Sequence, residues 1–233
     1  MFTRSDAGLR HWDWDGMVEA NRVRLIGLLA GLLVLMPQGS GVIRRAVWRE
    51  IVGRLVPLEA ALRRLIVVAA IDLNVTLPPV QPFPGNISKG IGSGERPPVF
   101  DLTDAIRRVG LPTRKRGPKR EPNICFLDEW TPRPKRAVPD DDDLLDAMAL
   151  RRRLAALRAA LDDLPKQAKR LARWMARGER VRKGGTWRRL YPMRSGRPPG
   201  HRAHGMRDED KVLATCHDLA LRAREMVGNK AHG

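Results

Sequence analysis

Apolar residues recur with a helical period in the C-terminal third of the chain. Their spacing alternates between four and three residues, which places them on one face of a helix and is typical of a coiled coil or an antiparallel helix pair. The members of this seam are Leu150, Leu154, Leu157, Leu161, Leu164, Ala168, Leu171 and Met175. Proline is tolerated in a first helical turn but not in a helix interior, so Pro165 predicts a restart with a changed direction. The seam needs a facing helix, from this chain or from a second copy in a homo-oligomer.

Two patterns near the N-terminus predict further helices. The first covers residues 16–36, with Asp15 as the N-cap and Pro37 as the stop. The second is an apolar stripe that leaves most arginines, including Arg64, outside it, and that Pro57 kinks or divides. The stripe consists of Ile43, Val47, Ile51, Leu55, Leu58, Leu62, Leu65 and Ala69. We expect an antiparallel hairpin or a three-helix unit that buries these apolar surfaces.

Acidic residues mark two helix starts in the second half of the chain. An amphipathic helix is predicted over residues 208–227, with acids in its first turn and with Gly228 and Asn229 at its end. The four aspartates at 140–143 are interpreted as the N-cap and first-turn acids of the helix that carries the seam.

Proline and glycine dominate the middle of the chain, where few apolar residues are periodic. Such a segment cannot bury enough surface to offset the entropy of ordering it, so residues 74–139 are interpreted as a largely disordered, basic linker. Within it, residues 99–108 suggest a short helical turn and residues 124–127 a lone strand. The sequence therefore predicts an all-α protein with helical units at 1–73 and 140–233, and leaves open whether the two units touch.

Positive charge is concentrated in one segment. Residues 166–207 contain fourteen Lys or Arg residues and one acid, and so contribute +13 of the formal net charge of +18. Such a field attracts phosphates or anionic lipid, and Trp187 and Tyr191 within it offer stacking surfaces for unpaired bases. We therefore expect a polyanion-binding protein, with nucleic acid as the first choice of partner. The expected nucleic-acid-binding residues are Lys169, Arg170, Arg173, Arg177, Trp187, Arg188, Arg189, Tyr191, Arg194 and Arg197.

The alternative is a peripheral membrane or scaffold protein that docks through its apolar N-terminal helices onto lipid or a partner. The apolar run Leu25–Met36 is twelve residues long, and the charge-free window reaches Ile43 only by including Pro37 and a Gly-Ser-Gly turn. A spanning helix needs about 20 apolar residues, so a buried core helix is favoured. Two cysteines are too few for a disulfide framework, and a reducing cytoplasm is expected.

Three smaller features suggest specific chemistry but also have plainer interpretations. Residues 194–198, Arg-Ser-Gly-Arg-Pro, are similar to the core of AT-hook peptides, but a solvated basic linker is favoured. His201, His204 and Cys216 have the chemistry of zinc ligands without the spacing of a known finger, and Cys216 lies on an apolar stripe, so a core thiol is favoured. Because no catalytic motif is present, we expect neither an enzyme nor a cofactor.

Three segments of the second half resemble a group of basic proteins predicted from alphaproteobacterial genomes. They are Leu161–Trp174, Gly196–Arg202 and Leu213–Ala220, within a likeness that covers mainly residues 150–225 and, more loosely, Arg63–Ala70. The resemblance implies a bacterial cytoplasmic origin. The resemblance implies no activity, fold or ligand.

Overall fold

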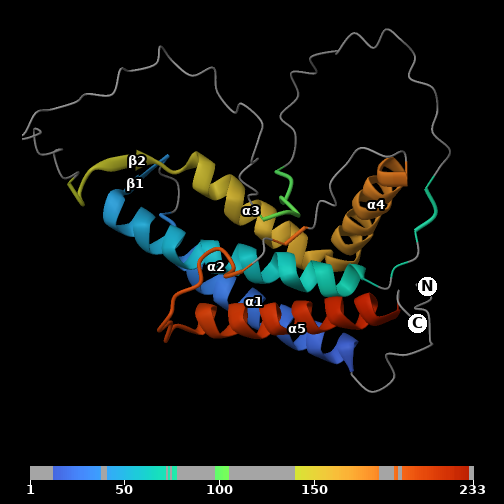
Figure 1. Cartoon of the computed structure of the whole chain (residues 1–233). Coiled ribbons are helices and arrows are strands. Elements are labelled where there is room, and N and C mark those ends of the chain that lie inside the picture. The colour runs from blue at the N-terminus through green and yellow to red at the C-terminus, as the bar shows by residue number, and fades with distance from the viewer. Residues whose placement is uncertain are drawn as a thin grey trace, which may run out of the picture.

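The computed structural model describes residues 13–37, 41–71, 73, 75–77, 98–104, 140–183, 192–193 and 196–230. Within these ranges the chain is mostly helical, which confirms the predicted all-α class (Figure 1). In chain order the elements are α1 (Trp14–Val34), β1 (Val42–Arg44), α2 (Arg45–Ala70), β2 (Leu144–Asp146), α3 (Met148–Asp162), α4 (Leu164–Lys183) and α5 (Asp208–Lys230).

Helix α2 is the centre of the fold. It contacts α1, α3, α4 and α5, and in Figure 1 it runs through the middle with α5 along one side and α3 along the other. Its second half is buried on almost every side, from Pro57 to Ala70. The N-terminal and C-terminal helices therefore share one hydrophobic core, so the two predicted helical units are in contact.

The seam on α3 and α4 is the other half of this core. Leu150, Leu154, Leu157, Leu161, Leu164, Ala168 and Leu171 are buried, and Met175 packs against them at the edge. The restart at Pro165 is confirmed, because α3 ends at Asp162 and α4 begins at Leu164. Between them, the Asp163 carboxylate accepts a hydrogen bond from the Lys166 amide at 3.1 Å. The seam is thus covered by helices of the same chain.

The apolar run in α1 also belongs to this core. Leu25, Leu29, Leu32 and Met36 are buried. None of the described helices combines the length and the apolar character needed to cross a bilayer. The helix begins two residues earlier than expected, since Asp13 rather than Asp15 is the N-cap and accepts a hydrogen bond from the Gly16 amide at 2.8 Å.

The aspartates at 140–143 serve a different helix from the one predicted. Strand β2 follows them and pairs antiparallel with β1, with Ile43 opposite Leu145. Carbonyl oxygens of the aspartate segment accept hydrogen bonds from Arg45 N and Ala46 N, at 2.8 and 3.0 Å. The aspartates therefore complete the start of α2, where acids also suit the helix dipole, and their predicted role in the first turn of α3 is wrong.

Two predicted boundaries need further correction. Helix α5 runs on to Lys230, past the predicted stop at Gly228 and Asn229. Residues 99–104 contain no helix. The rest of the 99–108 segment and the predicted strand at 124–127 lie outside the described residues, as does most of the predicted linker.

Helix α2 continues through Pro57, so the proline does not divide it. Proline lacks an amide hydrogen, which removes the helical donor for the carbonyl four residues earlier, that of Gly53. Arg202, from the loop 196–207, donates to this carbonyl through Nη2 at 3.3 Å. Gly200 in the same loop has a φ of +80°, and a Cβ there would lie 2.7 Å from the Pro57 nitrogen. The loop 196–207 therefore packs closely against α2 at Pro57 and supplies the donor that the proline lacks.

Candidate functional site

Helix α4 divides sharply into an apolar face and a basic face. Its apolar residues Leu164, Ala168, Leu171 and Ala172 are buried in the core. At 100° per residue, five cations fall on the opposite side, and the segment 164–178 contains no acid. This basic face consists of Lys166, Lys169, Arg170, Arg173 and Arg177, all of them exposed. Figure 1 shows α4 rising away from the α2 and α5 helices toward its C-terminal end.

The cations of the basic face differ in their local partners. Lys166, with a side chain 76% exposed, lies 4.0 Å from the Asp163 carboxylate. Arg170 donates through Nη1 to the Phe100 carbonyl at 2.9 Å, so it also has a structural role. Within the described residues, Arg173 and Arg177 make no hydrogen bond or ion pair. Their charge is therefore available to an external anion.

The structure brings four of the predicted binding residues together: Lys169, Arg170, Arg173 and Arg177. Arg197 is exposed in the loop 196–207 and is not part of α4. The other predicted binding residues lie outside the described part: Trp187, Arg188, Arg189, Tyr191 and Arg194.

The AT-hook interpretation of the segment at 194–198 is wrong for its described residues. Gly196 has a φ of +82°. Pro198 is buried, and its carbonyl accepts a hydrogen bond from the His201 amide at 3.1 Å, which closes a turn. A hook has to be thin and extended to lie in a minor groove. A folded segment with its proline in the core cannot do so, and it is not a solvated linker either.

The candidate zinc ligands are not brought together in the part of the chain that the structure describes. His201 and His204 are exposed, whereas Cys216 is fully buried on α5. The described residues contain no cluster of three histidine, cysteine or acidic side chains that could hold a metal ion. Burial raises the pKa of the Cys216 thiol to about 12. The thiol is therefore neutral at physiological pH, which suits a core side chain and not a ligand or a nucleophile.

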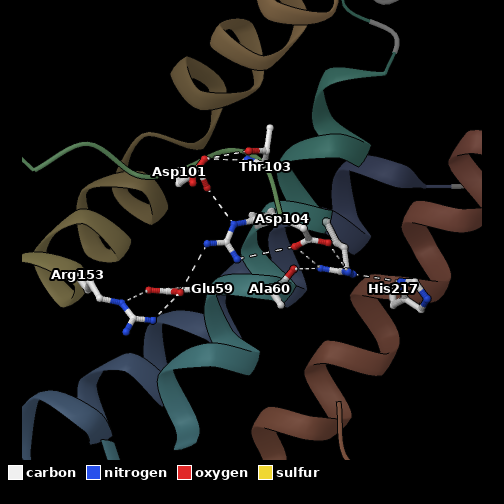
Figure 2. A network of polar contacts seen from close by, with 9 residues as sticks. Glu59, Ala60, Asp101, Thr103, Asp104, Arg153 and His217 are labelled. Atoms are coloured by element: carbon white, nitrogen blue, oxygen red, sulfur yellow. Dashed lines mark hydrogen bonds and ion pairs between the residues drawn. The ribbon is translucent and has the colours of Figure 1, made fainter. Parts of the chain in front are cut away.

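A buried network of charged side chains, which the sequence analysis missed, joins four parts of the fold (Figure 2). The ion pair between Arg64 of α2 and Asp104 is its centre. Arg64 Nη2 lies 3.0 Å from Asp104 Oδ2, and both side chains are fully buried. Arg64 also donates to the Ala60 carbonyl at 2.7 Å and to Nδ1 of His217, on α5, at 3.1 Å. Each of the three guanidinium nitrogens thereby has a hydrogen-bond partner, as a buried charge requires.

Asp104 belongs to a short non-helical segment, residues 98–104, which we call the strap. Phe100 and Leu102 of the strap are buried in the core. Arg63 of α2 donates to the Asp101 carbonyl at 3.0 Å, and its guanidinium lies 5.4 Å from the centre of the Phe100 ring. The strap is therefore fixed to α2 by polar and apolar contacts together.

The network extends to α3 through Glu59 of α2. Glu59 is buried and accepts two hydrogen bonds from Arg153, both at 3.0 Å. This bidentate geometry is the strongest that an arginine and a carboxylate form. The contact holds α3 against α2, so Arg153 is not the inert surface residue that its place outside the seam suggests.

A cavity of about 710 Å³ lies where α1 meets the junction of α3 and α4. Its apolar lining includes Val18, Leu73 and Leu164. The polar lining consists of Asp15, Glu19, Arg22 and Asp162. Arg22 already donates to the Leu161 carbonyl at 2.8 Å and to Glu19 at 2.7 Å.

No family model, curated protein or solved structure matches the chain. A function must therefore be argued from the geometry of the molecule itself.

Proposed function

We propose that the protein binds nucleic acid by its phosphates, through the basic face of α4. The observation that carries this proposal is the concentration of five cations, with no acid among them, on the exposed side of one packed helix. Lysine and arginine that neutralise phosphates release condensed counterions, and this release drives sequence-independent binding. Phosphate contacts also carry no base information. The expected partner is therefore nucleic acid of any sequence.

The packing of α4 favours nucleic acid over a lipid surface. A basic helix that lies on a membrane inserts its apolar face among the acyl chains. In α4 that face is already buried in the protein core, at Leu164, Ala168 and Leu171. The exposed side of α4 is dominated by its five cations, which suits a phosphate backbone better than a bilayer.

The alternative of a peripheral membrane or scaffold protein has one observation in its favour. The outer side of α1 exposes apolar side chains, among them Val23 and, with 85% of its surface accessible, Val34. Exposed apolar surface of this kind marks docking sites when it is contiguous. Vesicles containing anionic lipid, and neutral vesicles as their control, therefore belong in the binding experiments.

Salt dependence of binding tests the proposal. The logarithm of the affinity for a labelled duplex should fall linearly with the logarithm of the salt concentration, by about 0.9 per phosphate contact. Substituting Arg173→Ala and Arg177→Ala together should flatten this slope by nearly two contacts and weaken all sequences alike. Fluorescence anisotropy at several salt concentrations measures both effects.

The matched control is Arg222→Ala with Arg224→Ala, which removes two exposed arginines from α5 and lowers the net charge by the same amount. This control should leave the slope nearly unchanged. Equal slopes for the two double variants would show that only overall charge matters. Binding weaker than about 100 μM near physiological salt, at the weak end of non-specific association, for both duplex and single-stranded oligonucleotides would exclude nucleic acid, and binding to the anionic vesicles would then favour the membrane alternative.

A further inference from the structure

The contact between Arg64 and His217 fixes the protonation state of the histidine. A guanidinium only donates hydrogen bonds and stays charged at every relevant pH. Arg64 Nε donates to His217 Nδ1 at 3.1 Å, so Nδ1 must carry a lone pair and the proton must be on Nε2. A proton added at Nδ1 would remove this acceptor and place a second cation against a fully buried guanidinium.

The surroundings of His217 include charges of both signs. Arg64 faces it from α2 and His201 from the loop 196–207, and both oppose a further positive charge. Asp104 of the strap and Asp218 of α5 favour that charge. The balance is unfavourable: burial first, and then Arg64, hold the pKa of His217 below its ordinary value of 6.5.

We propose that His217 is an acid-sensitive latch on the strap. In the neutral state it accepts from Arg64 and keeps the guanidinium turned onto Asp104. Protonation removes the acceptor, sets two cations against each other and releases the pair. The strap is the element that gives way, because α2 and α5 are long helices packed against each other and against α1, whereas the strap is a short segment anchored at a few points.

Opening of the strap has a consequence for α4. The Phe100 carbonyl, which accepts from Arg170, leaves with the strap. Arg170 then keeps its hydrogen bond to Gln167, at 3.1 Å, but no longer donates to the strap, and its charge joins those of Arg173 and Arg177. The latch itself does not depend on whether nucleic acid is the ligand of that face.

Hydrogen exchange of the Asp104 amide tests the latch, because Asp104 N donates to the Pro192 carbonyl, outside the strap, at 3.0 Å. The direction of the pH effect follows from linkage. Because the pKa of His217 is lowered in the closed state, closure of the strap is most stable above pH 6.5, and this stability is lost as the pH falls through the lowered pKa. Between pH 7.5 and 5.5, opening should increase by up to about tenfold, after correction for the intrinsic exchange rates.

The decisive variant is His217→Asn, because its side-chain oxygen can replace Nδ1 as the acceptor but cannot take up a proton. Its Asp104 amide should show no acid-induced opening, although His201 and His204 are unchanged. The same opening in the variant, or no opening in the wild-type chain, would overturn the latch. Imidazole ¹⁵N shifts of the wild-type protein give a second test that needs no substitution: a proton on Nδ1 at pH 7.5 would contradict the acceptor role.

Discussion

Replacing Arg64 with methionine should destabilise the protein by about 3–5 kcal/mol, the cost of breaking one side of a buried ion pair. The cost arises because the Asp104 carboxylate stays fully buried after its nearest cation is removed. The next cation, Arg63, lies 3.8 Å away. The exposed pair of Arg158 and Asp162 offers the matched control, since Arg158→Ala should cost about 0–1 kcal/mol. Chemical denaturation of both variants measures the difference.

A double variant separates the buried charge from the packing. Combining Arg64→Met with Asp104→Leu removes both charges, and hydrophobic replacements of buried pairs are often neutral. The double variant should therefore recover much of the stability that Arg64→Met loses. A loss below about 1 kcal/mol for Arg64→Met alone would mean that the pair is solvated, and the buried network would then be disproved.

The second large effect is expected in the seam. Leu157 is 1% exposed, so Leu157→Ala leaves a cavity and should cost about 2–5 kcal/mol. The same substitution at Leu144, whose side chain is largely exposed in β2, should change stability by no more than about 0.5 kcal/mol. Thermal unfolding that shifts equally for the two variants would show that α3 is not packed.

Arg153 is not a suitable control for that experiment. From the sequence, Arg153→Ala should have little effect, because the residue lies outside the seam. In the structure it satisfies the buried Glu59 through two hydrogen bonds. Without Arg153, the Glu59 carboxylate would still have Arg63 as an ion-pair partner, at 3.6 Å.

The seam and the basic face of α4 could be predicted because both are periodic. A repeat of three and four residues specifies a helix and its buried side, whatever the rest of the chain does. Leu154, Leu161 and Leu171 are buried for this reason. The cations that alternate with them must then lie on the outside.

The buried network could not be predicted, because its partners are far apart in the sequence. Arg64 stands within an apolar stretch, where a charge is normally assigned to the surface. Its carboxylate partner is 40 residues away and its histidine partner is 153 residues away. A local pattern contains no information about either contact, and the strap that supplies Asp104 has no periodic signal.

Long-range hydrogen bonding also explains why α2 is not divided at Pro57 and why the aspartates at 140–143 serve a different helix from the one predicted. Proline predicts a break only if nothing satisfies the carbonyl it leaves open, and Arg202 comes from a distant loop to do so. The aspartates resemble a local helix start, yet they complete the first turn of α2, a hundred residues earlier in the chain. In both cases the local sequence indicates the chemical feature but not the distant residue that it contacts.

Lysine footprinting tests the central claim most directly. Acetylation of exposed lysines in the intact protein, with and without an excess of duplex, can be read by mass spectrometry at Lys166 and Lys169 on the basic face. Lys211 on α5 is a comparably exposed internal control, although it pairs with Asp208 at 2.9 Å. The account predicts that the duplex protects Lys166 and Lys169 and leaves Lys211 as reactive as before. Protection of Lys211 instead, or no protection on α4 under conditions where the duplex is bound, would contradict it.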